Sequence, residues 1–220
     1  MAFTIVTGAN RGIGLELCKQ LKARGADVIG VCRKGSSELD ALDVRIEPGI
    51  DVSDASSVEQ LGKRLAGTDI DVLINNAGVL QPGNLDRMNF KSIEQQFAIN
   101  ALGPLRVTMA LLPLLHDGSK VVIITSRMGS MADNGSGGYY GYRMSKAAVN
   151  AAGVSLAHDL KSRGIAVGLF HPGMVATEMT GKNGIPAEEA VRGILTQIDA
   201  LTMERSGRFT HVGTGEELPW

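Results

Sequence analysis

The chain has 220 residues, of which 44% are hydrophobic and 20% are charged. This length and composition predict one globular domain over residues 1–220 with a sizeable apolar core, and they exclude a disordered chain. The 22 Lys and Arg residues nearly balance the 23 Asp and Glu residues, so strongly anionic partners such as nucleic acid or an acidic membrane are disfavoured.

Targeting and redox signals are few. The longest apolar run, 107–115, is far shorter than the roughly 20 residues that span a bilayer. Met1 leads directly into an expected strand without a secretory signal, so we expect a cytoplasmic protein without a membrane-spanning helix. Cys18 and Cys32 are too few for a disulfide framework or a zinc site, and we expect two buried, reduced thiols.

Short β-branched segments recur along the chain and predict strands that are buried on both faces. They cover residues 3–7, 27–32, 44–47, 71–75, 120–125 and 165–170. Segments with helical spacing lie between them, at 14–24, 58–65, 90–115 and 139–163. Because alternating strands and helices require crossover connections, the predicted fold class is α/β, a single-domain Rossmann-like doubly wound parallel sheet with helices on both faces.

Three local features refine these elements. Ser53 or Asp54 can cap the helix at 58–65 by accepting hydrogen bonds from its first amides. Gly103-Pro104 lies inside the pattern at 90–115 and predicts a kink or a junction of two helices. Gly153 in the helix at 139–163 costs about 1 kcal/mol relative to alanine, which predicts close packing against a neighbour.

A glycine-rich turn follows the first expected strand and opens the first expected helix. Its sequence from Thr7 to Gly14 is TGANRGIG. Glycine permits a sharp turn and a close approach of the backbone to a diphosphate, and the amides of a helix N-terminus favour an anion. We predict that a dinucleotide cofactor binds here, through Gly8, Asn10, Arg11, Gly12, Ile13 and Gly14.

The end of the second expected strand bears on which dinucleotide binds. NAD-selective sites carry an acidic residue there, whereas an arginine accommodates the 2′-phosphate of NADP. This strand ends in Arg33 and Lys34, with no carboxylate. Arg33 and Arg11 therefore favour NADP(H), since guanidinium groups make forked hydrogen bonds to phosphate. The alternative is that both are solvated surface arginines.

Tyr142 and Lys146 are four residues apart and so lie one turn apart on the same face of an expected helix. A neighbouring ammonium favours the phenolate form of tyrosine, which makes the phenol usable as an acid or base near neutral pH. Such a pair arises easily by chance, so its weight depends on the other motifs in the chain.

Five motifs in this order closely resemble the short-chain dehydrogenase/reductase family over nearly the whole chain. They are the glycine turn, Asn75-Asn76-Ala77-Gly78, Ser126, Tyr142-x-x-x-Lys146 and Pro172-Gly173. Asp51-Val52 matches the pair that contacts adenine in that family, and Thr177 matches a residue on the nicotinamide side. The resemblance implies further cofactor contacts at Asn76, Ala77, Gly78, Tyr142, Lys146, Pro172, Gly173 and Val175.

The resemblance also implies catalytic roles. Tyr142 is the general acid or base, Lys146 binds the nicotinamide ribose and lowers the pKa of the tyrosine, Ser126 orients the carbonyl, and Asn100 holds a water in a proton relay. This agrees with the residue chemistry, because hydride delivery makes a carbonyl oxygen negative and preplaced donors stabilise it. Ser126 lies 16 positions before Tyr142, a few more than is usual in the family, so Ser130 is an alternative.

The surroundings of the expected site leave several alternatives. His171 either lines the substrate pocket or is structural, and His116, His158 and His211 share no metal spacing, so we expect no metal. The segment 174–185 falls where the family carries a lid. Met128 and Met131 either line the pocket or pack in the core. Trp220 is either loose or covered by a partner subunit.

The resemblance narrows to a subgroup that contains the Sniffer carbonyl reductases and the C-factor signalling proteins. It implies an NADPH-dependent oxidoreductase, of the carbonyl reductase or alcohol dehydrogenase type, that acts on a small-molecule ketone, aldehyde or secondary alcohol. In the family, helices matching 90–115 and 139–163 pack between subunits, so we expect a homo-oligomer, a dimer or a tetramer. The alternative is a dinucleotide-binding sensor with little turnover.

Overall fold

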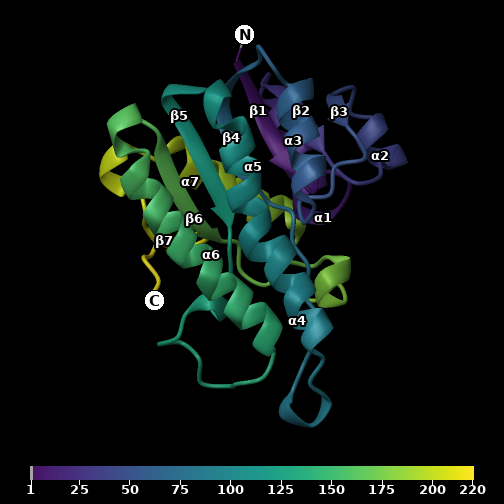
Figure 1. Cartoon of the computed structure of the whole chain (residues 1–220), viewed down its shortest axis with the longest axis vertical. Coiled ribbons are helices and arrows are strands. Elements are labelled where there is room, and N and C mark those ends of the chain that lie inside the picture. Colours follow the sequence, from purple (N-terminus) through teal and green to yellow (C-terminus); the bar gives the residue numbers. More distant parts are fainter. Residues whose placement is uncertain (1) are drawn as a thin grey trace.

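A seven-stranded parallel sheet forms the centre of the computed structural model, which describes residues 2–220 (Figure 1). The strands lie side by side in the order β3-β2-β1-β4-β5-β6-β7. Strands β2 and β3 are therefore added on one side of β1 and strands β4 to β7 on its other side, so the strand order reverses between β1 and β4. Their bounds are β1 Ala2–Thr7, β2 Asp27–Val31, β3 Arg45–Glu47, β4 Asp69–Asn75, β5 Leu115–Ile124, β6 Ala166–His171 and β7 Phe209–His211.

Helices connect the strands and cover both faces of the sheet. Their bounds are α1 Gly12–Ala23, α2 Ser37–Asp40, α3 Ala55–Arg64, α4 Phe90–Phe97, α5 Gly103–Leu111, α6 Tyr140–Asp159 and α7 Ala187–Asp199. In Figure 1, α3, α5 and α6 cross in front of the strands, whereas α7 lies behind them. Among the shorter turns, 3₁₀ helices at Arg127–Gly129 and Glu178–Thr180 follow β5 and β6.

Two apolar cores lie on opposite faces of the sheet because successive strand residues point to opposite sides. In β1, Ile5 belongs to one core and Val6 to the other. Leu111 of α5 packs into the first core, and Ile194 of α7 packs into the second. The predicted α/β fold with helices on both faces is therefore confirmed.

The sequence prediction omitted β7 and α7 and began β4 and β5 too late. β7 has three residues, too few to show an alternating pattern. The helical signal of α7 was present but not recognised. Its buried residues recur at helical spacing after Pro186, and they are Ala190, Val191, Ile194, Leu195 and Ile198.

The segment 90–115 contains the predicted junction. A π-helical stretch, Ala98–Leu102, separates α4 from α5, and α5 begins at Gly103 with Pro104 in its first turn. The helical segment Phe90–Leu114 is nevertheless continuous over 25 residues, long and apolar enough by length and composition to cross a membrane. The expectation that the chain lacks a membrane-spanning helix therefore stays a prediction. Core helices of folded domains also pass this test, and 44% of the 18-residue stretch that passes it is buried within the chain.

Two other local predictions are confirmed. Asp54, one of the two proposed capping residues, caps α3 by accepting a hydrogen bond of 2.9 Å from the Ser56 amide. Gly153 packs tightly in α6, since a Cβ there would lie 2.6 Å from Cδ2 of Leu169 in β6. The glycine thus brings α6, which carries Tyr142 and Lys146, close to the sheet.

Candidate active site

The loops that follow β1, β4 and β6 meet at the carboxyl edge of the sheet. Gly8 (φ +68°) lies so close to the loop after β4 that a Cβ would be 2.9 Å from Cα of Ala77. Gly12 (φ +54°) faces the loop after β6, where a Cβ would lie 3.3 Å from Cγ2 of Thr177. The predicted glycine turn therefore lies at the point where strand order reverses, which is where α/β sheets bind their ligands.

The N-terminus of α1 is suited to an anion. Within residues 2–220, no side chain caps this helix, and its first turn contains no acidic residue. Gly14 is required because a Cβ there would overlap the carbonyl oxygen of Gly8. The first amides of α1 point along the helix axis with the positive end of its dipole, so the turn fits the diphosphate of a dinucleotide.

The Asn76-Ala77-Gly78 motif is bound to the end of β1. The Thr7 hydroxyl accepts hydrogen bonds from the amides of Asn76 and Ala77 at 3.0 and 3.1 Å, and the Asn76 side chain donates to the Thr7 carbonyl at 2.9 Å. The structure thus brings this motif beside the glycine turn, although about 70 residues separate them in the chain. These contacts hold one wall of the site independently of any ligand.

Tyr142, Lys146 and Ser126 come together at the ends of α6 and β5. All three are buried, and the Ser126 hydroxyl is a hydrogen-bond partner of the Tyr142 side chain. The Lys146 ammonium lies 5.7 Å from the centre of the Tyr142 ring and donates to the Ile124 carbonyl at 2.9 Å. The geometry therefore favours Ser126 as the serine beside the tyrosine, as the sequence preferred.

Burial governs the proton affinities of the pair. It raises the pKa of Tyr142 to about 12, because the phenolate loses its hydration, and the hydrogen bond from Ser126 offsets only part of this shift. Burial also lowers the pKa of Lys146 to about 8. The resemblance predicted that Lys146 lowers the pKa of Tyr142, and this effect stays a prediction, since burial and Ser126 are the causes of the shift in the chain alone. The phenol therefore keeps its proton at neutral pH.

Asn100 lies in the π-helical stretch between α4 and α5 and is fully buried. Its side chain accepts from the Val79 amide at 2.9 Å and donates to the Val79 carbonyl at 2.8 Å and to Ser145 at 3.0 Å. A Cβ on Gly78 would lie 3.4 Å from its Oδ1 and 3.9 Å from Nζ of Lys146. Asn100 thus positions the loop after β4, and its role in a proton relay stays a prediction.

The two arginines expected to bind a 2′-phosphate lie at the rim of the site and are exposed. Arg33 lies 3.9 Å from Asp51, and Arg11 forms an ion pair of 2.9 Å with Glu178. Burial favours the neutral form of Asp51, but hydrogen bonds from Ser53 and the charge of Arg33 together hold the pKa of its carboxyl below the usual value. Both guanidinium groups are therefore accessible, although Arg11 already has a partner.

The loop after β6 forms a small closed structure. Val175 pairs with Ile185, so the expected lid folds back on itself around the 3₁₀ turn that Thr177 begins. Pro172 and Val175 are buried, and Gly173 has φ +82°. His171, at the end of β6, packs edge-on against His211 at 5.2 Å. Burial lowers the pKa of His171 to about 4, so this histidine is neutral at physiological pH.

The loop after β5 separates the roles of Ser126 and Ser130. Ser130 is buried, donates to the carbonyl of Trp220 at 3.2 Å and accepts from the Asp133 amide at 3.1 Å. Trp220 is therefore held by the chain itself and is not loose, whereas its cover by a partner subunit stays a prediction. Met131 is exposed, so it does not pack in the core.

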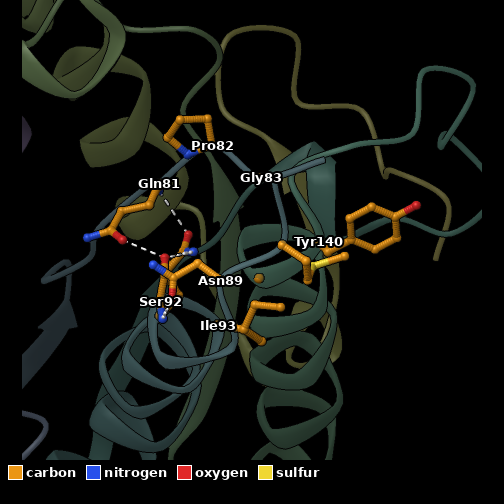
Figure 2. A pocket seen from close by; sticks show the side chains of 10 residues that line it. Gln81, Pro82, Gly83, Asn89, Ser92, Ile93 and Tyr140 are labelled. Atoms are coloured by element: carbon orange, nitrogen blue, oxygen red, sulfur yellow. Dashed lines mark hydrogen bonds between the residues drawn. The ribbon is translucent and has the colours of Figure 1, made fainter. Parts of the chain in front are cut away.

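A small pocket with polar and apolar walls lies beside Gly141 on the side of α4 (Figure 2). Gln81, Ser92 and Gln96 are joined by hydrogen bonds that fix the loop after β4 onto α4. The ring of Tyr140 points away from this pocket in Figure 2, whereas Gly141, the residue before Tyr142, forms part of its wall. Sequence reasoning missed these residues, because their amide and hydroxyl side chains form no recognisable motif.

Comparison with known proteins identifies the family. Residues 2–187 match the model of the short chain dehydrogenases, so the chain belongs to this family. A curated relative, 1-hydroxy-2-glutathionyl-2-methyl-3-butene dehydrogenase of Rhodococcus sp. (strain AD45), is 44% identical over the full length of both chains. The C-signal protein of Myxococcus xanthus is 49% identical over 158 residues, which cover 69% of this chain and 93% of that protein.

Solved structures agree with this assignment. The NADPH-bound carbonyl reductase from chicken fatty liver superposes with a TM-score of 0.90 at 28% identity, covering 100% of this chain and 99% of that one. The carbonyl reductase Sniffer of Drosophila melanogaster superposes with a TM-score of 0.91 at 26% identity, covering both chains fully. The resemblance to Sniffer and C-factor proteins that the motifs predicted is therefore confirmed.

Proposed function

We propose that this chain is an NADPH-dependent oxidoreductase that transfers hydride between the nicotinamide and a small-molecule ketone, aldehyde or secondary alcohol. One observation carries the proposal. Tyr142, hydrogen-bonded to Ser126 and one helical turn from Lys146, lies at the same edge of the sheet as an uncapped helix N-terminus with three glycines. A proton donor and a dinucleotide site adjoin each other.

The residues divide the work of carbonyl reduction. The bound nicotinamide supplies the hydride. The Tyr142 hydroxyl donates a proton to the carbonyl oxygen, and Ser126 donates a hydrogen bond that holds this oxygen in place. Lys146, next to the tyrosine, binds the nicotinamide ribose and stabilises the phenolate that proton donation leaves. The cofactor would be held by the glycine turn together with residues of the neighbouring loops, which are Asp51, Val52, Asn76, Ala77, Gly78, Pro172, Gly173, Val175 and Thr177.

The preference for NADP(H) is supported by Arg11 and Arg33 and by the NADPH held in the chicken carbonyl reductase. The name of the Rhodococcus relative describes a dehydrogenase of a glutathionyl-substituted alcohol. A substrate panel should therefore contain simple ketones and aldehydes together with alcohols that carry a glutathionyl group.

Replacement of Tyr142 by phenylalanine tests the proposal. Turnover of NADPH with the best carbonyl of the panel should fall by about 10²–10⁴-fold, because general acid catalysis is lost, while NADPH still binds. Tyr139→Phe, which removes a hydroxyl from the partly exposed residue that precedes α6, is the matched control and should keep full activity. Equal turnover of wild type and Tyr142→Phe would contradict the mechanism.

A sensor with little turnover is the second candidate, and the 49% identity with the Myxococcus C-signal protein favours it. The two candidates differ in one measurement: tight NADPH binding without turnover of any carbonyl or alcohol supports the sensor. The homo-oligomer and the cytoplasmic location stay predictions. Size-exclusion chromatography with light scattering, with and without NADPH, tests the first of these.

A further inference from the structure

The loop that carries Ser126 folds as a compact unit. The Ser126 hydroxyl accepts a hydrogen bond of 3.1 Å from the Met128 amide and so begins the 3₁₀ turn Arg127–Gly129. Arg127 forms an ion pair of 2.6 Å with Asp133 across the loop. Beyond Asp133, the glycine-rich stretch at 134–137 is exposed, and the Arg143 side chain of α6 donates hydrogen bonds to the Gly137 carbonyl at 3.3 Å and to the Ser136 hydroxyl at 2.9 Å.

One side of this loop packs directly on the backbone of α6. Gly129 is buried, and a Cβ there would lie 2.7 Å from the carbonyl carbon of Lys146. The backbone contact between Gly129 and Lys146 therefore links the loop of Ser126 to the helix that carries Tyr142.

The other side of the loop is held by residues 216–220, which we call the brace. The carbonyl oxygen of Trp220 accepts hydrogen bonds from the Ala132 amide at 2.9 Å and from the Ser130 hydroxyl at 3.2 Å. In Figure 1 the C-terminal segment accordingly ends beside the loop that follows β5. Two donors converging on one oxygen fix the loop at a point four to six residues from Ser126.

The brace itself is attached to the sheet. Leu218 is buried in a small cluster with Leu169 and Phe209, and its amide donates to the Phe209 carbonyl at 2.7 Å. The indole of Trp220 stacks on the Phe209 ring, with 5.4 Å between ring centres and an angle of 25° between the planes. The position of the Trp220 carbonyl therefore depends on the stacking of its side chain.

We propose that Trp220 and Ser130 are positioning residues, which act through Ser126 by clamping its loop between α6 and the brace. The inference rests on the proposed reductase function. It assigns to Ser130, the alternative catalytic serine of the sequence, a role in holding the loop. It also explains how Ser126 reaches Tyr142 although a longer connection than usual separates them, since the brace holds the loop at Ser130 and Ala132, on the side nearer Ser126.

Kinetics of Trp220 variants test the inference. Trp220→Ala should lower kcat for carbonyl reduction by about tenfold, because loosening a positioned donor weakens its effect, and should leave the Kd for NADPH unchanged. Trp220→Phe keeps an aromatic ring on Phe209 and should restore most of kcat. Met203→Ala, which truncates a partly buried side chain that packs against the apolar core containing Val6, controls for general destabilisation. The inference is overturned if Trp220→Ala and Met203→Ala reduce kcat equally.

A double-mutant cycle separates positioning from a structural role. In a Ser126→Ala background, Trp220→Ala should have no further effect on kcat, because the group through which it acts is gone. The same fold-loss in both backgrounds would overturn the inference. Ser130→Ala should follow the same pattern with a smaller loss, since one of the two hydrogen bonds to Trp220 remains.

Hydrogen exchange gives a readout that does not depend on turnover. In Trp220→Ala, the amides of Met128, Ala132 and Asp133 should exchange faster, whereas amides in α1 should keep the wild-type rate. If the Ala132 amide exchanges at the wild-type rate in Trp220→Ala, the proposed role of the brace is overturned, whatever the activity of the variant. If wild type reduces no carbonyl while exchange still rises, the proposed function fails and the clamp on the loop stands.

Discussion

Substituting Gly129 by alanine perturbs the contact on which the geometry of the site depends. The added Cβ would lie 2.7 Å from the carbonyl carbon of Lys146, 2.9 Å from its oxygen and 3.0 Å from the Ala147 amide nitrogen. Non-bonded carbon atoms prefer about 3.5–4.0 Å, so the two segments must separate by roughly 1 Å. The atoms in contact belong to helix backbone, and no flexible side chain can yield in their place.

Two effects follow from this separation. Overpacking of this kind costs about 1–3 kcal/mol of unfolding free energy. For a chain of this size, that corresponds to a fall in Tm of about 2–12 °C. A displacement of about 1 Å between Ser126 and Tyr142 should lower kcat by about 10²-fold. The Kd for NADPH should change less than kcat, because the glycine turn is untouched and Gly129 contacts the cofactor site only through the backbone of Lys146.

Thermal unfolding and steady-state kinetics of Gly129→Ala measure these effects, with Gly135→Ala as the matched control. Gly135 lies in the same loop, and a Cβ there would meet nothing within 4 Å. The control should therefore keep wild-type Tm and kcat. Wild-type values for Gly129→Ala, or equal losses in both variants, would refute the argument from packing.

Three further predictions use other contacts. Lys146 has a pKa of about 8 in the folded chain against 10.5 ordinarily, so between these pH values the unfolded state holds more protons. The unfolding free energy of wild type relative to Lys146→Met should therefore rise between pH 8 and 10.5, and a constant difference in urea titrations would contradict this. Asn100→Ala leaves the partly buried amide and carbonyl of Val79 without their side-chain partner and removes one of the hydrogen bonds of the Ser145 hydroxyl, so it should cost about 1–3 kcal/mol in the same assay. Glu178→Gln releases Arg11, so fluorescence titration should give tighter binding of NADPH with NADH unaffected; equal changes for both cofactors would argue against a 2′-phosphate contact at Arg11.

The features that could be predicted from the sequence are those that depend on residues close together in the chain. The glycine turn could be predicted because sharp turns and close backbone approaches need residues without a Cβ, and Gly8 and Gly14 meet that need in the structure. The relation of Tyr142 to Lys146 followed from helical periodicity alone. Alternation of strands and helices was likewise sufficient for the parallel sheet.

Contacts between residues that are far apart in the sequence could not be predicted in this way. Ser130 and Trp220 are 90 positions apart, and Arg11 and Glu178 are 167 apart, so no spacing pattern joins either pair. The raised pKa of Tyr142 could not be predicted for a related reason. The sequence shows the neighbouring lysine but not the depth of burial, and burial has the larger effect on the phenol.

The raised pKa of Tyr142 bears on the direction of the reaction. With a pKa of about 12, the phenol is protonated at pH 7 and ready to donate to a carbonyl oxygen, whereas alcohol oxidation needs the phenolate as a base. The rate of reduction should therefore stay constant from pH 6 to 7, where Lys146 also keeps its charge, while the rate of oxidation rises steadily over the same range. Initial rates in both directions, at saturating cofactor, measure this difference. An oxidation rate that does not change with pH would show that proton transfer in the working enzyme does not depend on the buried phenol, and Tyr142→Phe should abolish whatever pH dependence is found.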